Sequence, residues 1–183
     1  MKRLSGCRKA ALGFLLGWLA MAPLAAQVSR EYDVKAAFLY NFVTFTDWPA
    51  EAFATPDSPY VIGVMGSDPF GTALDEIIGG EQVKGRALVV HRFVRLEEAT
   101  QCHVLFISAS ETRRVKEILQ RVRGQPVLTV GDLAGFAEAG GAIGFTATSR
   151  VGLVVNPAAL RNARLTLSSK LLRLAQLVPE GQP

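Results

Sequence analysis

Short apolar runs alternate with segments of helical periodicity through the middle of the chain, and this alternation constrains the fold more than any other feature. Mostly apolar runs predict strands at 60–66, 88–93, 102–107 and 127–130. Caps and periodicity predict helices at 69–78, 111–123 and 132–139. Strands that alternate with helices in this way predict a mainly parallel sheet with helices on both faces.

Two further apolar runs, 142–146 and 151–155, lie too close together for a helix to connect them. Such neighbours predict an antiparallel hairpin at the edge of the sheet. Asn156-Pro157 has the cap-plus-proline pattern of a helix start, and closely spaced leucines predict a last helix over 168–178. The expected fold class is therefore α/β: three layers, a mainly parallel sheet with helices on both faces, and an antiparallel edge hairpin near the C-terminus.

The first 26 residues have the pattern of a secretory signal peptide. Four cations and no acid lie within residues 2–9, an unbroken apolar run follows over 10–22, and small residues lead to Ala26. The apolar run is shorter than the ~20 residues that a membrane-spanning helix needs; an uncleaved anchor is the alternative. Cleavage after Ala26 leaves 157 of the 183 residues, which is the size of a single domain over 27–183. The sequence thus predicts an exported, periplasmic protein.

The charge of the exported part argues against a nucleic-acid partner. The whole chain has 20 Lys and Arg against 16 Asp and Glu, and the four excess cations all lie in the signal segment. Residues 27–183 are therefore formally neutral, whereas a nucleic-acid-binding domain needs a basic face. No nucleic acid is expected among the partners.

Only one cysteine, Cys102, remains once the signal segment with Cys7 is removed. A lone cysteine cannot form an internal disulfide, so Cys102 is a buried small apolar residue, a free thiol, or an intermolecular bridge. Its position at the start of an apolar strand favours burial.

The sequence gives little support for catalysis, metal binding or a cofactor. His91 and His103 are the only histidines, and neither has the spacing of a metal site. Ser108 and Ser110 follow a predicted strand, and His103 and Asp132 lie elsewhere in the chain. A hydrolase that uses one of these serines is a further hypothesis, but no G-x-S-x-G turn marks a nucleophile. We therefore expect no enzyme activity, no catalytic residue, no metal and no cofactor.

The turn at 66–71 is the candidate place for a small-molecule pocket. It joins a predicted strand to a predicted helix, where open α/β sheets often bind ligands. Its candidate pocket residues are Ser67, Asp68 and Phe70. The glycine patterns of dinucleotide and phosphate loops are absent, so plain turn and cap chemistry is the favoured explanation. A periplasmic small-molecule-binding accessory protein is the alternative function.

The first predicted helix, 30–46, is apolar nearly all round. Such a helix is either buried in the core or part of an interface, and the last helix poses the same alternatives. We expect the interface with a partner protein or a second copy to involve these helices and the strand at 151–155. The candidate interface residues are Phe38, Phe42, Phe45, Trp48, Val151, Leu153, Leu171 and Leu174.

Several segments, taken in order, resemble the YfiR-type periplasmic regulators. They are 32–42 (YDVKAAFLYNF) followed by Trp48-Pro49, 68–71 (DPFG), Gly85-Arg86, 102–107 (CHVLFI), 127–132 (VLTVGD), Gly140-Gly141, Asn156 and 167–172 (LSSKLL). Each segment alone is short, but together they cover nearly the whole exported part in the same order.

The resemblance implies an α/β domain in the periplasm, often dimeric and without enzyme activity. Well-understood members bind the periplasmic sensory part of an inner-membrane diguanylate cyclase and hold it inactive, which lowers cyclic di-GMP and biofilm formation. The expected partner is therefore such a domain or that of another membrane sensor. The type member has paired cysteines, whereas the exported part of this chain has only Cys102. This difference argues against redox control through an internal disulfide.

Overall fold

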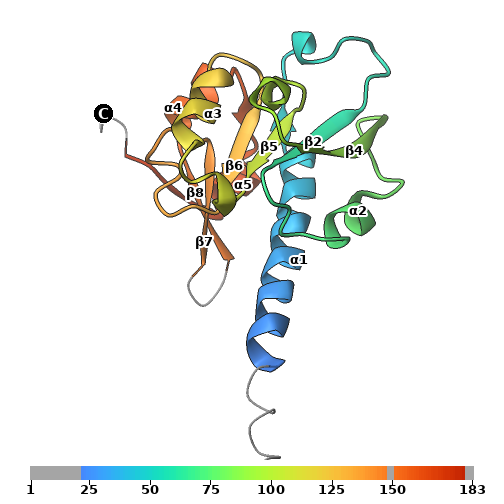
Figure 1. Ribbon diagram of the computed structural model, residues 1–183. Helices are drawn as coiled ribbons and strands as arrows, with labels where there is room; N and C mark the ends of the chain where they lie inside the picture. Colours follow the sequence, from blue (N-terminus) through green and yellow to red (C-terminus); the bar gives the residue numbers. More distant parts are fainter. Residues whose placement is uncertain (1–21, 148–150, 180–183) are drawn as a thin grey trace, which may run out of the picture.

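The computed structural model describes residues 22–147 and 151–179 (Figure 1). Most of the predicted signal segment, with Cys7, lies outside the described residues. The helices are α1 (Ala22–Thr44), α2 (Ala73–Ile78), α3 (Val115–Arg121), α4 (Pro157–Asn162) and α5 (Ser169–Leu172), with 3-10 turns η1 (Ala50–Ala52), η2 (Leu96–Thr100) and η3 (Ala109–Glu111). The strands are β1 (Thr46–Asp47), β2 (Tyr60–Met65), β3 (Gln82–Val83), β4 (Arg86–Phe93), β5 (Val104–Ile107), β6 (Leu128–Gly131), β7 (Ile143–Ala147), β8 (Val151–Val155), β9 (Thr166–Leu167) and β10 (Ala175–Leu177).

One eight-stranded sheet with the order β10-β8-β7-β6-β5-β2-β4-β3 organises the fold. Strands β4, β2, β5, β6 and β7 are parallel neighbours, and β8 returns antiparallel to β7. Strand β10 then pairs parallel with β8, and β3 pairs antiparallel with β4. The predicted fold class, a mainly parallel sheet with an antiparallel hairpin near the C-terminus, is confirmed. From β2 the chain continues to β4, which lies on one side of β2, and then crosses to β5, which lies on the other side of β2. The strand order therefore reverses between β2 and β5.

Two hydrophobic clusters lie on the two faces of the sheet. Along β5, Val104 and Phe106 belong to the cluster under α1, and Leu105 and Ile107 belong to the cluster under α3. All four side chains are fully buried, as expected for a parallel strand covered on both faces. The side-chain period of two along a strand therefore divides one apolar run between two layers.

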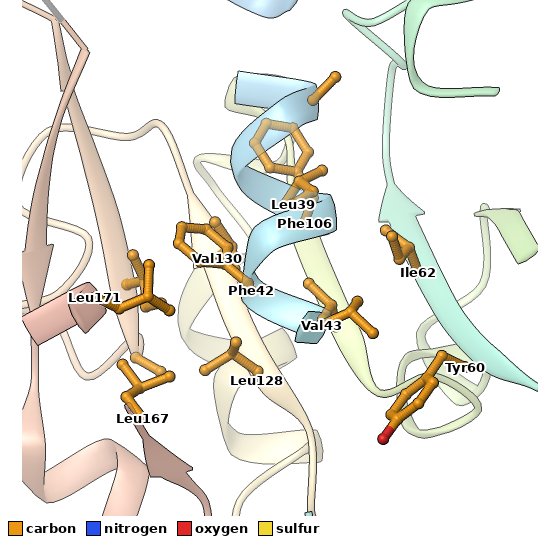
Figure 2. Close-up of a cluster of buried hydrophobic side chains, with 14 of the residues drawn as sticks. Leu39, Phe42, Val43, Tyr60, Ile62, Phe106, Leu128, Val130, Leu167 and Leu171 are labelled. Carbon is orange, nitrogen blue, oxygen red and sulfur yellow. The ribbon is translucent and has the colours of Figure 1, made fainter. Parts of the chain in front are cut away.

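Helix α1 fills the centre of the first layer. Its Leu39, Phe42 and Val43 follow the i, i+3, i+4 spacing of one helix face and are fully buried. Figure 2 shows them between the strands that carry Ile62, Phe106, Leu128 and Val130 and the C-terminal segment that carries Leu167 and Leu171. Full burial of one such side chain contributes roughly 1.5–3 kcal/mol, so α1 is held mainly by this face.

The predicted last helix over 168–178 is wrong in its second half. Ser168 caps α5, and the helix ends at Leu172. Residues Ala175–Leu177 form β10 instead, because the free edge of β8 offers them backbone partners. Pairing with β8 thus outweighs the leucine spacing that favours a helix.

The remaining differences between predicted and observed helices have causes in the local backbone conformation and capping. No helix forms over 132–139, where Gly135 has φ +70° in the left-handed region. Helix α2 starts at Ala73, later than predicted, because Gly71 at φ +58° interrupts the segment before it. The predicted helix over 111–123 splits into η3 and α3, and Ser108 caps the first piece in place of Ser110.

Candidate functional site

Helix α1 carries an exposed apolar stripe beside the carboxyl ends of the parallel strands. The N-terminal part of α1 extends past the sheet on the same side as the C-terminal end of β7 and the N-terminal end of β8 (Figure 1). Val34 is 45% exposed, and Phe38, one turn later, is half-buried with its ring 5.9 Å from that of Phe145 in β7. Side chains four residues apart share one face of a helix. Val34 and Phe38 therefore form one surface, called the α1 stripe from here on.

A buried ion pair fixes α1 at this place. Lys35 is only 3% exposed, and its Nζ lies 3.2 Å from Oδ2 of Asp132, which directly follows β6. The same Nζ lies 2.6 Å from Oε1 of Glu31, one turn earlier on α1. A buried charge is tolerated only when it is paired, so the Asp132 carboxylate requires Lys35, whereas Lys35 is neutralised by Asp132 and Glu31 together. The pair holds α1 against the carboxyl end of β6 and thereby fixes the orientation of the α1 stripe.

Tyr32 completes this polar cluster. Its hydroxyl donates a 2.7 Å hydrogen bond to Oδ2 of Asp132, and its ring lies 4.4 Å from Nζ of Lys35. Burial, the hydrogen bond to Asp132 and the carboxylate charges raise the pKa of Tyr32, so it remains a donor. The ring also meets Phe70 edge-on at 5.6 Å. Tyr32 thereby connects α1 to the turn after β2 as well as to β6.

The turn after β2, where a pocket was predicted, is occupied by its own side chains. Phe70 is 5% exposed and packs edge-on against Phe106 at 4.8 Å. The backbone N–H of Ser67 donates to Oγ of Ser110 at 2.9 Å. A Cβ at Gly66 would collide with the Ser110 hydroxyl, so the two turns touch where the strand order reverses. Small-molecule binding at Ser67, Asp68 and Phe70 stays a prediction, and these contacts do not favour it.

Asp68 belongs to a surface ion-pair group instead of a cavity. Its Oδ1 accepts from the backbone N–H of Phe70 at 2.7 Å, and its Oδ2 lies 2.9 Å from Nε of Arg92. Arg92 also pairs with Asp75 at the start of α2. The hydrogen bond to Asp75 and the charges of Asp68 and Asp75 raise the pKa of Arg92, and its guanidinium lowers the pKa of Asp75. The group joins β4 to α2 on the surface.

His103 lies at the opposite end of the sheet, in an aromatic cluster before β5. Its ring stacks on Phe53 at 4.6 Å and lies within 6.1 Å of Tyr60 and Trp48. Its Nδ1 accepts a 3.1 Å hydrogen bond from the backbone N–H of Val61. Burial lowers the pKa of His103 to about 4, with the Ala52 backbone acting in the opposite direction and Arg86 adding to the fall. His103 is thus a neutral structural acceptor at neutral pH.

Cys102 is a free thiol inside the second cluster. It is 6% exposed, and its Sγ lies 3.5 Å from the carbonyl oxygen of Ala99. Burial raises the pKa of the thiol, which keeps it protonated. An intermolecular bridge through Cys102 would therefore require the surrounding cluster to open.

The predicted interface residues divide into three groups in this structure. Phe42, Leu153 and Leu171 are at most 5% exposed and lie in the core, so they are not available on the surface of the chain. Phe38, Phe45, Trp48 and Val151 are half-buried, and Leu174 is 68% exposed. The other large apolar side chains exposed in the described residues are Val34, Val94 and Leu177, and none of them is among the predicted interface residues. Because the helix is apolar nearly all round, its sequence pattern does not distinguish the exposed Val34 from the buried Phe42.

The candidate hydrolase residues are not brought together. His103 precedes β5 and Ser108 follows it, and five residues of extended strand span about 16 Å. Asp132 is engaged by Lys35 and Tyr32. Among the described residues, no group of three or more His, Cys, Asp or Glu side chains could hold a metal ion. No helix within 22–147 or 151–179 is long and apolar enough to cross a membrane.

Comparisons with known proteins agree with this fold. A model of the YfiR/HmsC-like family, DUF4154, matches residues 32–176. The chain is similar to a crystal structure of a conserved domain protein from Vibrio cholerae O1 biovar El Tor strain N16961, with a TM-score of 0.51 and 12% sequence identity. That alignment covers 81% of this chain and 60% of the other, and at this identity it shows the fold alone. A search of curated proteins found no match.

Proposed function

The chain belongs to the YfiR/HmsC-like family, and on that premise we propose that it represses an inner-membrane diguanylate cyclase by binding the periplasmic sensory domain of that enzyme. Membership of the family indicates a periplasmic regulator of diguanylate cyclase signalling, and a regulatory role instead of a catalytic one. The proposal adds the direction of the effect, repression, and the surface that makes the contact. Export through cleavage after Ala26 is part of the same proposal.

The observation that carries the proposal is the α1 stripe. Val34 is 45% exposed beside the half-buried Phe38, on the same helix whose Leu39, Phe42 and Val43 are fully buried. Exposed apolar surface on a rigid element is typical of a protein contact. The Lys35–Asp132 pair gives the required rigidity, because α1 cannot rotate without separating buried charges. Val151, at the start of β8, is half-buried and packs against the same hydrophobic cluster as α1.

Repression through such a surface works by population shift. The regulator must bind the inactive conformer of the cyclase more tightly than the active one. Moving a two-state enzyme from almost fully active to almost fully inactive requires a preference of about 10⁴-fold. Weak contacts outside the α1 stripe contribute to specificity. Loss of one apolar side chain of the stripe that becomes buried in the complex weakens binding to the cyclase by at least about tenfold.

The test uses two matched variants, Val34→Glu and Val94→Glu. Both replace an exposed valine by glutamate, but Val94 follows β4 and leads into η2, which packs on the second cluster. Tagged protein is purified from mild-detergent membrane extracts, and captured membrane proteins are identified by mass spectrometry. We expect capture of a protein with a periplasmic sensor and a diguanylate cyclase domain, with retention lost in Val34→Glu and kept in Val94→Glu.

Reconstitution of the captured cyclase then tests repression directly. Cyclic di-GMP synthesis should fall when the wild-type chain or Val94→Glu is added and should be unchanged by Val34→Glu. Stimulation of synthesis by the wild-type chain would contradict repression. Equal inhibition by both variants would place the contact surface away from α1. Capture of no cyclase in repeated purifications would remove the proposal altogether.

A further inference from the structure

Cations gather in the last part of the chain, although residues 27–183 are formally neutral. Residues 139–179 contain five Lys and Arg and no Asp or Glu. Four of these cations lie in the described residues, and all four are exposed: Arg161, Arg164, Lys170 and Arg173. Arg164 pairs with Glu51, whereas no acid among the described residues pairs with Lys170 or Arg173. The charge of these two side chains is therefore free to meet an anion outside the chain.

Helix α5 places these two cations beside an exposed leucine. The N–H groups of Arg173 and Leu174 donate to the carbonyls of Ser169 and Leu171, so the helical turn continues to Leu174. Lys170, Arg173 and Leu174 therefore have the i, i+3, i+4 spacing of one helix face. Leu171 points the other way and packs in the cluster under α1 (Figure 2). Leu174, in contrast, is 68% exposed.

Leu177 extends this surface along the edge of the sheet. It lies opposite Val155 in the pairing of β10 with β8. Residues paired across neighbouring strands project to the same face of the sheet, and Val155 belongs to the cluster under α1. Leu177 therefore projects to the face on which α5 packs, and it is 54% exposed because β10 is the outermost strand. The α5 surface is the name used below for Lys170, Arg173, Leu174 and Leu177.

We propose that the α5 surface binds an anionic phospholipid bilayer. The ammonium group of Lys170 and the guanidinium group of Arg173 meet the lipid phosphates, and the two leucines enter the boundary between headgroups and acyl chains. Cations interleaved with exposed leucines are typical of segments that lie in a membrane interface. An acidic protein surface or a nucleic acid would pair with the cations but leave the leucines against polar groups. A bilayer matches both parts of the surface.

Such a contact is peripheral and reversible. Each Lys or Arg close to an anionic bilayer strengthens binding about fivefold, and two such charges with two leucines give a modest affinity. The contact holds the chain at the membrane that contains the enzyme proposed as its partner. The inference rests on the periplasmic location that family membership indicates. It does not depend on repression or on the α1 stripe.

Sedimentation with lipid vesicles tests the inference. The chain is purified from the periplasmic fraction and its mass is checked, so that the apolar segment 10–22 does not contribute to binding. Vesicles of phosphatidylethanolamine and phosphatidylglycerol are compared with neutral vesicles of phosphatidylcholine. We expect binding to the anionic vesicles that weakens as the salt concentration rises, and little binding to the neutral ones.

Matched double variants locate the cationic part of the contact. Lys170→Gln/Arg173→Gln should raise the lipid concentration at half-saturation about twentyfold. The control is Lys116→Gln/Arg121→Gln, which removes two exposed cations from α3, on the opposite face of the sheet. It changes the net charge by the same amount and should bind like the wild type. Circular dichroism should show that both variants remain folded, because all the replaced side chains are exposed.

The leucines have their own tests. Leu174→Ser/Leu177→Ser should raise the half-saturating lipid concentration about tenfold or more, whereas Val94→Ser, which replaces another exposed apolar residue, should have no effect. The fluorescence of Leu174→Trp should shift to the blue when anionic vesicles are added, and that of Val94→Trp should not. A leucine variant that binds like the wild type, with no blue shift in Leu174→Trp, would overturn the bilayer in favour of an acidic surface.

Two further results would overturn the proposal. One is a wild-type chain that does not sediment with anionic vesicles, or sediments equally with neutral ones. The other is an equal loss of binding in the Lys170/Arg173 and Lys116/Arg121 variants, which would indicate attraction by overall charge and not by this surface. Capture of the cyclase by a chain that does not bind vesicles would remove this inference and leave the proposed function intact.

Discussion

Acidification should destabilise this protein through His103, and the size of the effect follows from the structure. The pKa of His103 is lowered from 6.5 to about 4 in the folded chain, chiefly by burial. Its Nδ1 accepts the hydrogen bond from Val61, so protonation also removes that bond. The unfolded chain binds the proton near pH 6.5, whereas the folded chain resists it until about pH 4. Stability contributed by neutral His103 is therefore complete above pH 6.5 and is lost as the pH falls towards 4.

The difference between these pKa values corresponds to about 3 kcal/mol of unfolding free energy, reached at and below pH 4. His103→Asn provides the comparison, because the asparagine Oδ1 can accept from the Val61 N–H but does not titrate. Loss of the ring contacts lowers the stability of this variant at every pH, so the informative quantity is the change between pH 7 and pH 4. The wild type should lose up to about 3 kcal/mol more than the variant over this interval.

Urea unfolding followed by the fluorescence of Trp48, whose ring lies 6.1 Å from that of His103, measures both proteins across the pH range. The control is His91→Asn, which removes an exposed histidine and leaves His103 in place; it should keep the wild-type acid dependence. If the unfolding free energies of the wild type and His103→Asn change by the same amount between pH 7 and pH 4, the reasoning is refuted. An NMR titration in which the His103 ring protonates near pH 6.5 would refute it as well.

The remaining predictions concern single buried groups. Lys35→Met should lower the unfolding free energy by about 3–5 kcal/mol, because it leaves Asp132 buried and unpaired; urea unfolding should show most of this loss recovered in Lys35→Met/Asp132→Asn. Cys102 should react with a thiol reagent such as DTNB only as fast as the chain unfolds, given its burial and raised pKa; rapid reaction under native conditions would contradict this. Asn156→Ala should cost about 1–2 kcal/mol, because the side chain caps α4 through two backbone N–H groups and also donates to the carbonyl of Ala137; an unchanged urea midpoint would contradict it.

The sequence predicts the central sheet well because its signals are local. Strands β2, β4, β5 and β6 are short apolar runs between turn residues, and each lies within about two residues of its predicted position. The hairpin of β7 and β8 follows from the short distance between two such runs. Strands β1 and β9 have two residues each and are too short to produce a pattern. Strand β10 was missed because the free edge of β8, which captures it, is a property of the folded sheet.

The candidate site was less predictable because its contacts are distant in sequence. Lys35 and Asp132 are 97 residues apart, and no local spacing links them. One usable signal was present: a lysine within a helix that is apolar nearly all round must find a buried partner. The exposure of Val34 could not be predicted, because it depends on where the sheet ends beneath α1.

The composition of the first core layer has a consequence for how the chain folds while it is being synthesised. Helix α1 is synthesised first, yet Leu39, Phe42 and Val43 share their cluster with residues as late as Leu171. A nascent chain that has not yet reached α5 therefore exposes an apolar helix with only part of its cover. Folding cannot proceed to completion from the N-terminus onward, and α1 is the segment that a chaperone would have to shield until the last strands arrive.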